Sequence, residues 1–286
     1  MNFDRFASDI TENNWKVYGV EVYKDGELIH SLGDTTEGLY DIYSATKSIL
    51  SIAVGICYDR GLINLDESVI NYLPKDRTDR LDNKQRTIFE KISIRRLLTM
   101  SVKGFPFRPE GEDYLDFALN LETIEPDVDC FEYGNIPPYI MCVVLQNVLD
   151  EPLGGFIEKN IFQVLGIDKY EYGLAPEGIF YGASKMKLTV NGLSRIGLLM
   201  LNKGEYKGKR IVSEEYVKLA TSKQTDAREG GYGFYYWMYR DGFSINGKWK
   251  QKCYCLPSKN LVITYLSHIE DDNMEELKRS MEENIL

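Results

Sequence analysis

The chain of 286 residues is 43% hydrophobic and 27% charged, which is typical of a globular protein long enough to bury a large core. Its formal net charge of -10 would repel phosphate groups and therefore argues against nucleic acid or an anionic membrane as a partner. The five cysteines lack metal-ligand spacing, and the sequence shows neither an N-terminal leader nor an apolar run of membrane-spanning length, so we expect a cytoplasmic protein without a metal site.

The N-terminal segment predicts one helix and two strands. Apolar residues recur at helical spacing through residues 3–10, which indicates a surface helix. Strands are expected over 17–23 and 28–32, because Asp25-Gly26 between them is a strong hairpin signal.

The segment from Tyr43 to Cys57 begins with polar residues and is then apolar on every side. This pattern predicts a buried helix that ends at Gly61. Ser44 takes a cap or first-turn position, and Lys47 lies one turn further along the same face. Burial and the helix dipole both lower the pKa of such a lysine, and a neutral amine can accept the serine proton. The pair indicates a nucleophile and its base. A capping serine beside a solvated lysine is the alternative, because SxxK arises by chance and recurs at Ser184-Lys185-Met186-Lys187.

The middle of the chain predicts a helical lobe. The charge-dense residues 75–86 indicate a solvated loop, and a short apolar helix is expected over 92–100. Residues 101–129 are rich in Phe, Pro, Gly and acidic side chains and are expected to be irregular surface or a substrate-facing lid. Further helices are expected over 137–150, 156–165 and 189–203, and after the capping residue Ser213.

From residue 232 the pattern becomes that of strands. Residues 232–239 are rich in aromatic side chains, and strands are expected over 248–256 and 261–265, followed by a closing amphipathic helix marked by Met274, Leu277 and Met281. Since helix and strands occur at both ends, we expect an α+β fold with one antiparallel sheet built from both termini and flanked by the terminal helices. The chain would form a single domain, 1–286, with a sheet lobe of about 1–43 and 226–286 and a helical lobe of about 44–225.

Several segments then follow one another in a recognisable order. They are Tyr43-Ser44-Ala45-Thr46-Lys47-Ser48, Leu97-Leu98-Thr99-Met100-Ser101, Phe131-Glu132-Tyr133-Gly134-Asn135 and Val164-Leu165-Gly166-Ile167. Together they resemble the motifs of the serine β-lactamase and penicillin-binding-protein superfamily, especially its class C-related branch of esterases and amide hydrolases. The resemblance covers nearly the whole chain, and it implies a β-lactamase/transpeptidase-like fold and a hydrolase that works through an acyl-enzyme.

The resemblance assigns roles to four residues. Ser44 would be the nucleophile and Lys47 the base that activates it. Tyr133 would pass protons to the leaving group, with a pKa lowered by neighbouring cations. Asn135 would orient Lys47 and the substrate carbonyl.

The third motif of the family falls on a predicted strand that begins Lys248-Trp249-Lys250, where it departs from the family pattern. Lys248 suits a cation that holds a substrate carboxylate, whereas Trp249 and Lys250 replace small residues. The backbone N–H groups of Ser44 and Gln251 would form the oxyanion hole. If both lysines face the cleft, the substrate should carry a carboxylate near the scissile bond and be slimmer than a bicyclic β-lactam.

The sequence therefore predicts a serine hydrolase that acts on a small ester or amide and needs no cofactor. A β-lactamase or D-alanyl peptidase is an alternative, although its substrates lie outside the cytoplasm. A catalytically silent binding protein of the same fold is another. No GxSxG, HExxH, P-loop or GxGxxG motif occurs, so other hydrolase, metal and nucleotide chemistries have no support.

Overall fold

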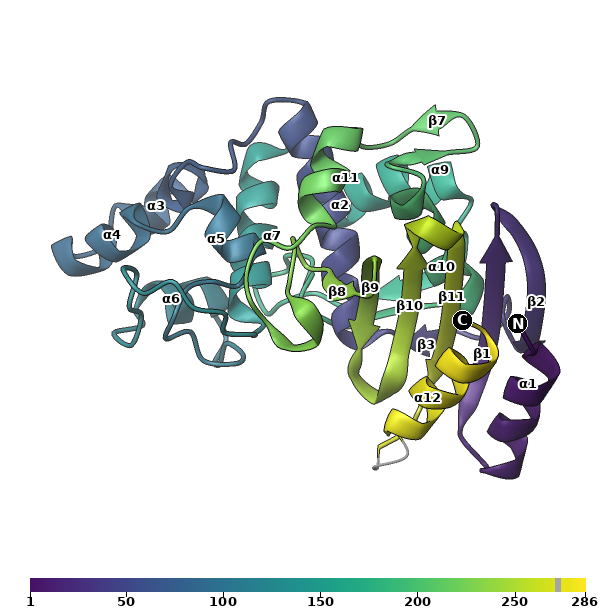
Figure 1. Cartoon of the computed structure of the whole chain (residues 1–286). Helices are drawn as coiled ribbons and strands as arrows, with labels where there is room; N and C mark the ends of the chain where they lie inside the picture. Colours follow the sequence, from purple (N-terminus) through teal and green to yellow (C-terminus); the bar gives the residue numbers. More distant parts are fainter. Residues whose placement is uncertain (271–273) are drawn as a thin grey trace.

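Six strands form the main sheet of the computed structural model, which describes residues 1–270 and 274–286 (Figure 1). They are β1 (Val17–Lys24), β2 (Glu27–Gly33), β8 (Trp237–Tyr239), β9 (Gly242–Gly247), β10 (Gln251–Leu256) and β11 (Leu261–Ser267). All neighbours are antiparallel, and the order is β2-β1-β11-β10-β9-β8. The N-terminal β1 thus pairs with the C-terminal β11, and the predicted α+β fold with a sheet built from both termini is confirmed.

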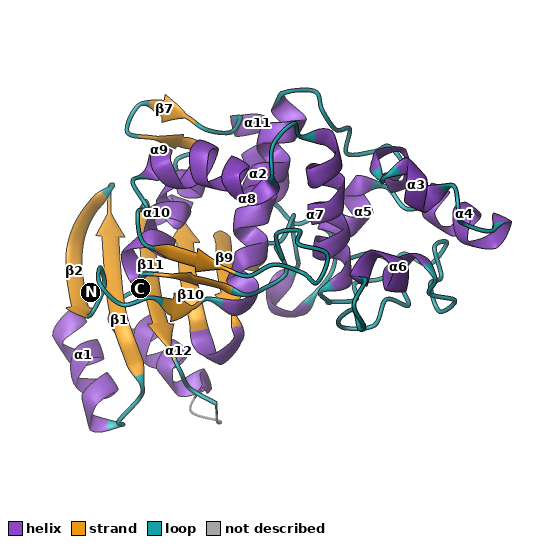
Figure 2. Cartoon of the chain, turned by 180° about the vertical axis from the view of Figure 1, so that it is seen from behind, coloured by secondary structure: helices purple, strands orange, loops and turns teal. Residues whose placement is uncertain are grey.

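Twelve α-helices occur in the described part of the chain. They are α1 (Phe3–Glu12), α2 (Thr46–Asp59), α3 (Lys75–Thr78), α4 (Asn83–Glu90), α5 (Ile94–Leu98), α6 (Tyr114–Leu119), α7 (Ile136–Val148), α8 (Leu153–Ile157), α9 (Gln163–Leu165), α10 (Val190–Leu201), α11 (Glu214–Ala220) and α12 (Met274–Asn284). The terminal helices α1 and α12 cover one face of the sheet and α10 covers the other (Figures 1 and 2). The remaining helices lie beside the sheet, with α2 next to it.

Two apolar cores hold these layers together. The smaller core joins α1 and α12 to the outer face of the sheet through residues such as Phe6, Ile263 and Leu277, because both helices are apolar along one side only. The larger core surrounds α2, where residues 46–57 are all buried. A helix that is apolar on every side is stable only when other apolar residues surround it. The first residues of α2 therefore lie inside the molecule.

Three short strands place another segment near the start of α2. They are β3 (Tyr40–Asp41), β4 (Tyr170–Tyr172) and β5 (Met186–Leu188), in the order β3-β5-β4. Tyr40 pairs with Leu188, and Ile42 N donates to Met186 O at 3.0 Å. The sheet thereby brings residues just before β5 to the region of Ser44. A hairpin of β6 (Glu205–Tyr206) and β7 (Lys209–Arg210) lies further away (Figure 1).

The structure contradicts some of the expected local elements. The expected loop over 75–86 contains α3 and the start of α4. Asp82 and Gln85 form a reciprocal capping box at the N-terminus of α4. The expected strand over 248–256 begins only at Gln251, because residues 248–250 form the turn between β9 and β10. The strand β9 was not predicted, since its sequence GFSING starts and ends with glycine and has little strand character.

Among the described residues, no single helix has the length and apolar composition needed to cross a membrane. One pair of segments, Ile136–Val148 and Leu153–Leu165, meets those requirements jointly across a bend of 88°.

The tight packing around α2 predicts a large effect of a small change. A methyl group at Gly55 would lie 2.5 Å from Cδ1 of the Tyr216 ring and 2.7 Å from Cγ2 of Val212. We expect Gly55→Ala to lower the free energy of unfolding in urea by about 1–2 kcal/mol, because overpacking outweighs the helix preference of alanine. Gly155→Ala in α8 is the control, because nothing lies within 4 Å of the added methyl group. Equal stability of the two variants would contradict this description of the core.

Candidate active site

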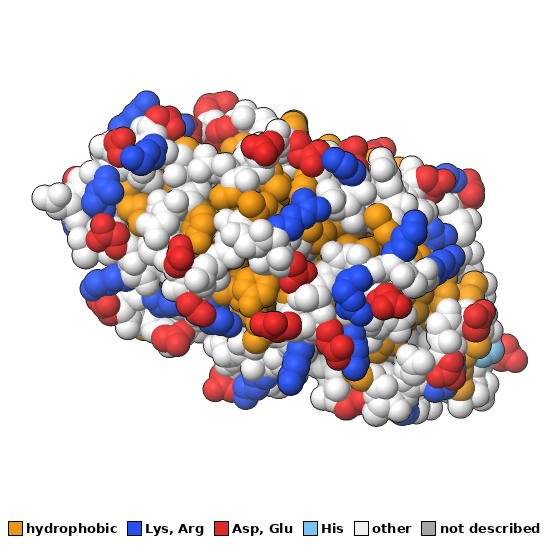
Figure 3. Space-filling view, turned by 90° about the horizontal axis from the view of Figure 1, so that it is seen from above, with side chains coloured by type: hydrophobic (Ala, Val, Ile, Leu, Met, Phe, Trp, Pro, Cys, Tyr) orange, Lys and Arg blue, Asp and Glu red, His pale blue; other side chains and the backbone are white. Residues whose placement is uncertain are grey.

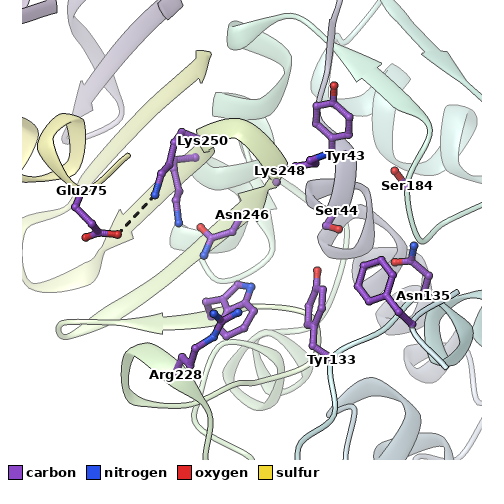
Figure 4. A pocket seen from close by; sticks show the side chains of 14 residues that line it. Tyr43, Ser44, Tyr133, Asn135, Ser184, Arg228, Asn246, Lys248, Lys250 and Glu275 are labelled. Atoms are coloured by element: carbon purple, nitrogen blue, oxygen red, sulfur yellow. Dashed lines mark ion pairs between the residues drawn. The ribbon is translucent and has the colours of Figure 1, made fainter. Parts of the chain in front are cut away.

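Ser44 lies in a tight turn that leads into α2. Residues 43–45 form a single 3₁₀ turn, in which Tyr43 has φ of 48°, a conformation that few non-glycine residues adopt. Thr46 Oγ1 donates to Tyr43 O at 2.6 Å and holds the turn. The Ser44 side chain makes no capping hydrogen bond to α2, so the alternative of a simple capping serine is wrong. Its hydroxyl faces Tyr133 instead (Figure 4), and its oxygen lies 3.0 Å from Lys47 Nζ.

Lys47 is 1% exposed, and three oxygen atoms surround its amine. Nζ donates to Asn135 Oδ1 and to Ala183 O, both at 2.7 Å, and lies 3.0 Å from Ser44 Oγ. The first two partners are carbonyl oxygens, which can only accept. A neutral amine has two N–H groups and one lone pair, so those two carbonyls use both N–H groups. The lone pair is then directed at the Ser44 hydroxyl.

The environment of Lys47 favours that neutral form. Burial lowers the pKa of the amine from 10.5 to about 7, because the charged form loses its hydration. The Cys142 thiol acts in the opposite direction with a smaller effect. A large fraction of the lysine is therefore uncharged near neutral pH and can accept a proton from Ser44.

Tyr133 completes the group around the nucleophile. Its side chain hydrogen-bonds to Ser44, and Lys47 Nζ lies 5.1 Å from its ring centre. The expectation of a lowered pKa for Tyr133 is wrong. Burial raises the pKa of Tyr133 to about 12, and the hydrogen bond to Ser44 and the charge of Arg228 offset only part of that rise. Tyr133 is consequently a protonated hydrogen-bond donor at neutral pH.

Asn135 is held by its backbone as well as by Lys47. It precedes α7, and its N–H donates to Phe107 O at 2.6 Å. Its side chain also hydrogen-bonds to Tyr181. The amide oxygen is thus fixed where it orients the Lys47 amine.

A cavity of about 460 Å³ opens in front of these residues (Figure 4). Its described lining combines the nucleophile, an aromatic wall and a group of charged side chains: Tyr43, Ser44, Phe107, Tyr133, Asn135, Ser184, Arg228, Trp237, Asn246, Gly247, Lys248, Lys250, Lys252 and Glu275. The Tyr133 and Trp237 rings lie 5.5 Å apart, and the Arg228 guanidinium stands over Trp237 at 5.9 Å. No group of three or more His, Cys, Asp or Glu in the described chain could hold a metal ion.

The segment after β9 differs from the expected third motif. Lys248 and Lys250 line the cavity, but as parts of a turn. Trp249 is absent from the described lining; it packs against Tyr43 and His268, with ring centres 5.0 and 4.1 Å away. Trp249 therefore does not narrow the cavity as expected.

Gln251 does not line the cavity either, which contradicts its expected place beside the substrate. It is 1% exposed, and its side chain bonds to Ser267, donating to O at 2.6 Å and accepting from N at 3.0 Å. The strand beside the nucleophile is β9, since a side chain at Gly247 would lie 2.1 Å from Ile42 O. The third motif was therefore predicted one strand too late, on the expected strand that begins at Lys248.

Sequence reasoning missed several residues of the cavity. Asn246 and Lys252 are directly opposite each other on β9 and β10, a pairing that a correct β9 would have revealed. Arg228 and Glu275 carry no local sequence signal. Ser184 was set aside with its SxxK match; it lines the cavity, but Lys187 pairs with Glu171 at 2.8 Å and is not its base.

Comparisons with known proteins agree with the fold. The model of the Beta-lactamase family matches residues 9–284. No curated protein matches the chain by sequence. The fold is similar to that of a "putative 6-aminohexanoate-dimer hydrolase from Bacillus anthracis", with 18% identity, a TM-score of 0.79 and coverage of 97% of this chain and 80% of that chain.

Two other solved structures show the same fold. FmtA from Staphylococcus aureus has 15% identity and a TM-score of 0.75, with 99% of this chain and 88% of that chain covered. A family VIII carboxylesterase has 15% identity and a TM-score of 0.74, with 98% and 95% covered.

Proposed function

The chain belongs to the beta-lactamase family, and on that basis we propose that it is a serine hydrolase that cleaves a small ester or amide through an acyl-enzyme intermediate. The observation that carries the proposal is the buried amine of Lys47, 3.0 Å from Ser44 Oγ, with its two N–H groups taken up by carbonyl oxygens. The names of similar structures include a 6-aminohexanoate-dimer hydrolase and a family VIII carboxylesterase, which supports this substrate class.

In acylation, the Ser44 hydroxyl gives its proton to the Lys47 amine while its oxygen forms a bond to the substrate carbonyl carbon. Backbone N–H groups of Ser44 and of the adjoining end of β9, in place of Gln251, would stabilise the resulting oxyanion. The bond to the leaving group then breaks, and the protonated Tyr133 gives its proton to that group. The Lys47 ammonium, close to the Tyr133 ring, restores that proton.

Deacylation uses the same residues in reverse. Water gives a proton to the neutral Lys47 amine and attacks the acyl carbon, and Ser44 leaves with the proton held by Lys47. Asn135 and Ala183 keep the amine in place through both steps, because their oxygens bind it at 2.7 Å. The aromatic wall of Tyr133, Trp237 and Phe107 offers an apolar surface for the substrate chain.

The mechanism predicts a specific pH dependence. Lys47 acts as a base only when deprotonated, so kcat/KM should rise with pH through its pKa of about 7 and then level off. Tyr133, with a pKa of about 12, should stay protonated over that range and cause no loss below about pH 10. The measurement is kcat/KM for a neutral ester between pH 5 and 10, corrected for background hydrolysis. A rate that falls as pH rises from 6 to 8 would contradict a lysine base.

A direct test of the proposed function is hydrolysis of a panel of short p-nitrophenyl esters and anilides. Wild type should release nitrophenol or nitroaniline, and Ser44→Ala prepared in parallel should not. Equal rates for the two proteins would assign any activity to a contaminant or to another residue.

A further inference from the structure

The charged side chains of the cavity are unevenly placed. Of its described lining residues, Arg228, Lys248, Lys250 and Lys252 are basic, and Glu275 is acidic. The chain as a whole has a net charge of -10, and on the face in Figure 3 acidic and basic side chains are interspersed. Positive charge is therefore concentrated in this cavity against the overall charge of the protein.

These cations lie in two places. Lys248 extends toward Tyr43, and its Nζ stands 4.2 Å over the neighbouring Trp249 ring (Figure 4). Lys250 extends to the opposite side, where its Nζ lies 3.7 Å from Glu275 Oε1, and Asn246 lies between that ion pair and Ser44 (Figure 4). The single cavity thus extends from the nucleophile past the end of β9, and we call the part lined by Asn246, Lys250, Lys252 and Glu275 its second compartment.

The second compartment lies under the first turn of α12. Lys252 pairs with Asn246 across β9 and β10, so both side chains stand on the same face of the sheet. Tyr254, two residues further, belongs to the core beneath α1 and α12, which shows that this is the outer face. Lys252 is 8% exposed and is held in place by the sheet, unlike a mobile surface lysine.

Glu275 shows which anion this compartment accepts. Its side chain is 73% exposed and projects from the start of α12, whereas the Lys250 side chain that it meets is 11% exposed. A carboxylate on an exposed arm therefore reaches a largely buried cation. Because water competes for the exposed partner, the pair is weak enough for another carboxylate to replace it.

We propose that Asn246, Lys250 and Lys252 form a carboxylate subsite, and that Glu275 occupies it until the substrate's own terminal carboxylate replaces it. The proposal rests on the serine hydrolase function proposed above, and it specifies the substrate class. The substrate is a linear ester or amide whose chain carries a carboxylate at the end remote from the scissile bond. Glu275 is then a specificity-determining residue that raises KM for anionic substrates.

The test uses p-nitrophenyl monoesters of succinate, adipate and suberate, each beside its neutral methyl-capped analogue. Wild type should prefer the free acid of at least one chain length. Lys250→Met should lower that preference about tenfold, the usual contribution of a charge-assisted hydrogen bond. Glu275→Gln should raise kcat/KM for the free acid about threefold through a lower KM.

Two matched controls separate these local effects from a change in total charge. Lys207→Met removes a lysine that also has a positive φ, 49° against 66° for Lys250, but lies outside the cavity. Glu276→Gln removes the next carboxylate of α12, which does not line the cavity. Neither control should alter the ratio of kcat/KM for the free acid to that for the capped ester. An unchanged ratio in Lys250→Met would overturn the subsite even if Ser44-dependent hydrolysis is present.

A binding measurement gives an answer that does not depend on turnover. To prevent hydrolysis of the ligand, the parent protein in this measurement is Ser44→Ala. Calorimetry should show that monomethyl adipate binds Ser44→Ala, binds the double variant Ser44→Ala/Lys250→Met more weakly, and binds Ser44→Ala/Glu275→Gln more tightly. Equal affinities for all three proteins, or no binding to any of them, would overturn the subsite and leave the serine hydrolase proposal to its own test.

Discussion

Replacement of Lys47 by arginine is expected to lower kcat by about 10²- to 10⁴-fold, the contribution of a well-placed general base. Arginine keeps a positive charge but does not deprotonate near neutral pH, so it cannot accept the Ser44 proton. Lys47→Met is the companion variant. Methionine is unbranched and similar in volume to lysine, and it removes the charge from a site that is 1% exposed. Both variants should be inactive for the same reason.

The control for these variants is their folded state. Lys47 Nζ binds Asn135 and Ala183, so thermal unfolding and circular dichroism must show that each variant is folded before its rate is interpreted. Turnover close to that of wild type in a folded Lys47→Met would show that another group accepts the serine proton, and the mechanism proposed here would be wrong.

Replacement of Ser44 by alanine is expected to have the largest effect, a loss of about 10⁴-fold or more in kcat, because no acyl-enzyme can form. The change removes one oxygen atom from a side chain at the cavity surface, so the midpoint of thermal unfolding should change little. Ser184→Ala is the matched control, since Ser184 lines the same cavity but has no lysine base. A larger loss in Ser184→Ala than in Ser44→Ala would reverse the assignment.

The parts of the fold that could be predicted are those with a strong repeating pattern. The buried α2 followed from a long apolar run, and the opening and closing helices followed from apolar residues on one side. The pairing of β1 with β11 followed from strands at both ends of the chain. These patterns are dictated by burial, which affects every residue of an element.

Without the family resemblance, the site was predictable only where its residues are close in sequence. Ser44 and Lys47 share one helical turn, and their separation in space follows from the helix alone. The place of Tyr133 and Asn135 was predicted from motif resemblance, and the pKa of Tyr133 was judged wrongly because burial outweighs the cations around it. Electrostatic effects of this kind depend on depth in the molecule, which a linear pattern does not give.

The second compartment of the cavity could not be predicted because it depends on tertiary contacts. The turn at 248–250 has two residues with positive φ, a feature that the sequence Lys248-Trp249-Lys250 does not announce. Because residues 248–250 form this turn, β10 begins at Gln251, three residues later than expected. Lys252, the second residue of β10, lines the cavity. Glu275 joins the site only because α12 packs on the sheet.

The central claim is that Ser44 is the nucleophile, and covalent labelling tests it most directly. The intact protein is treated with a fluorophosphonate, its mass is measured, and the modified peptide is mapped, with Ser44→Ala and Ser184→Ala treated in the same way. We expect one adduct, on Ser44, in wild type and Ser184→Ala, and none in Ser44→Ala. An adduct on Ser184 would contradict the account and assign the nucleophile to another serine. No adduct in a folded wild-type protein would also contradict it and would favour a catalytically silent binding protein of this fold.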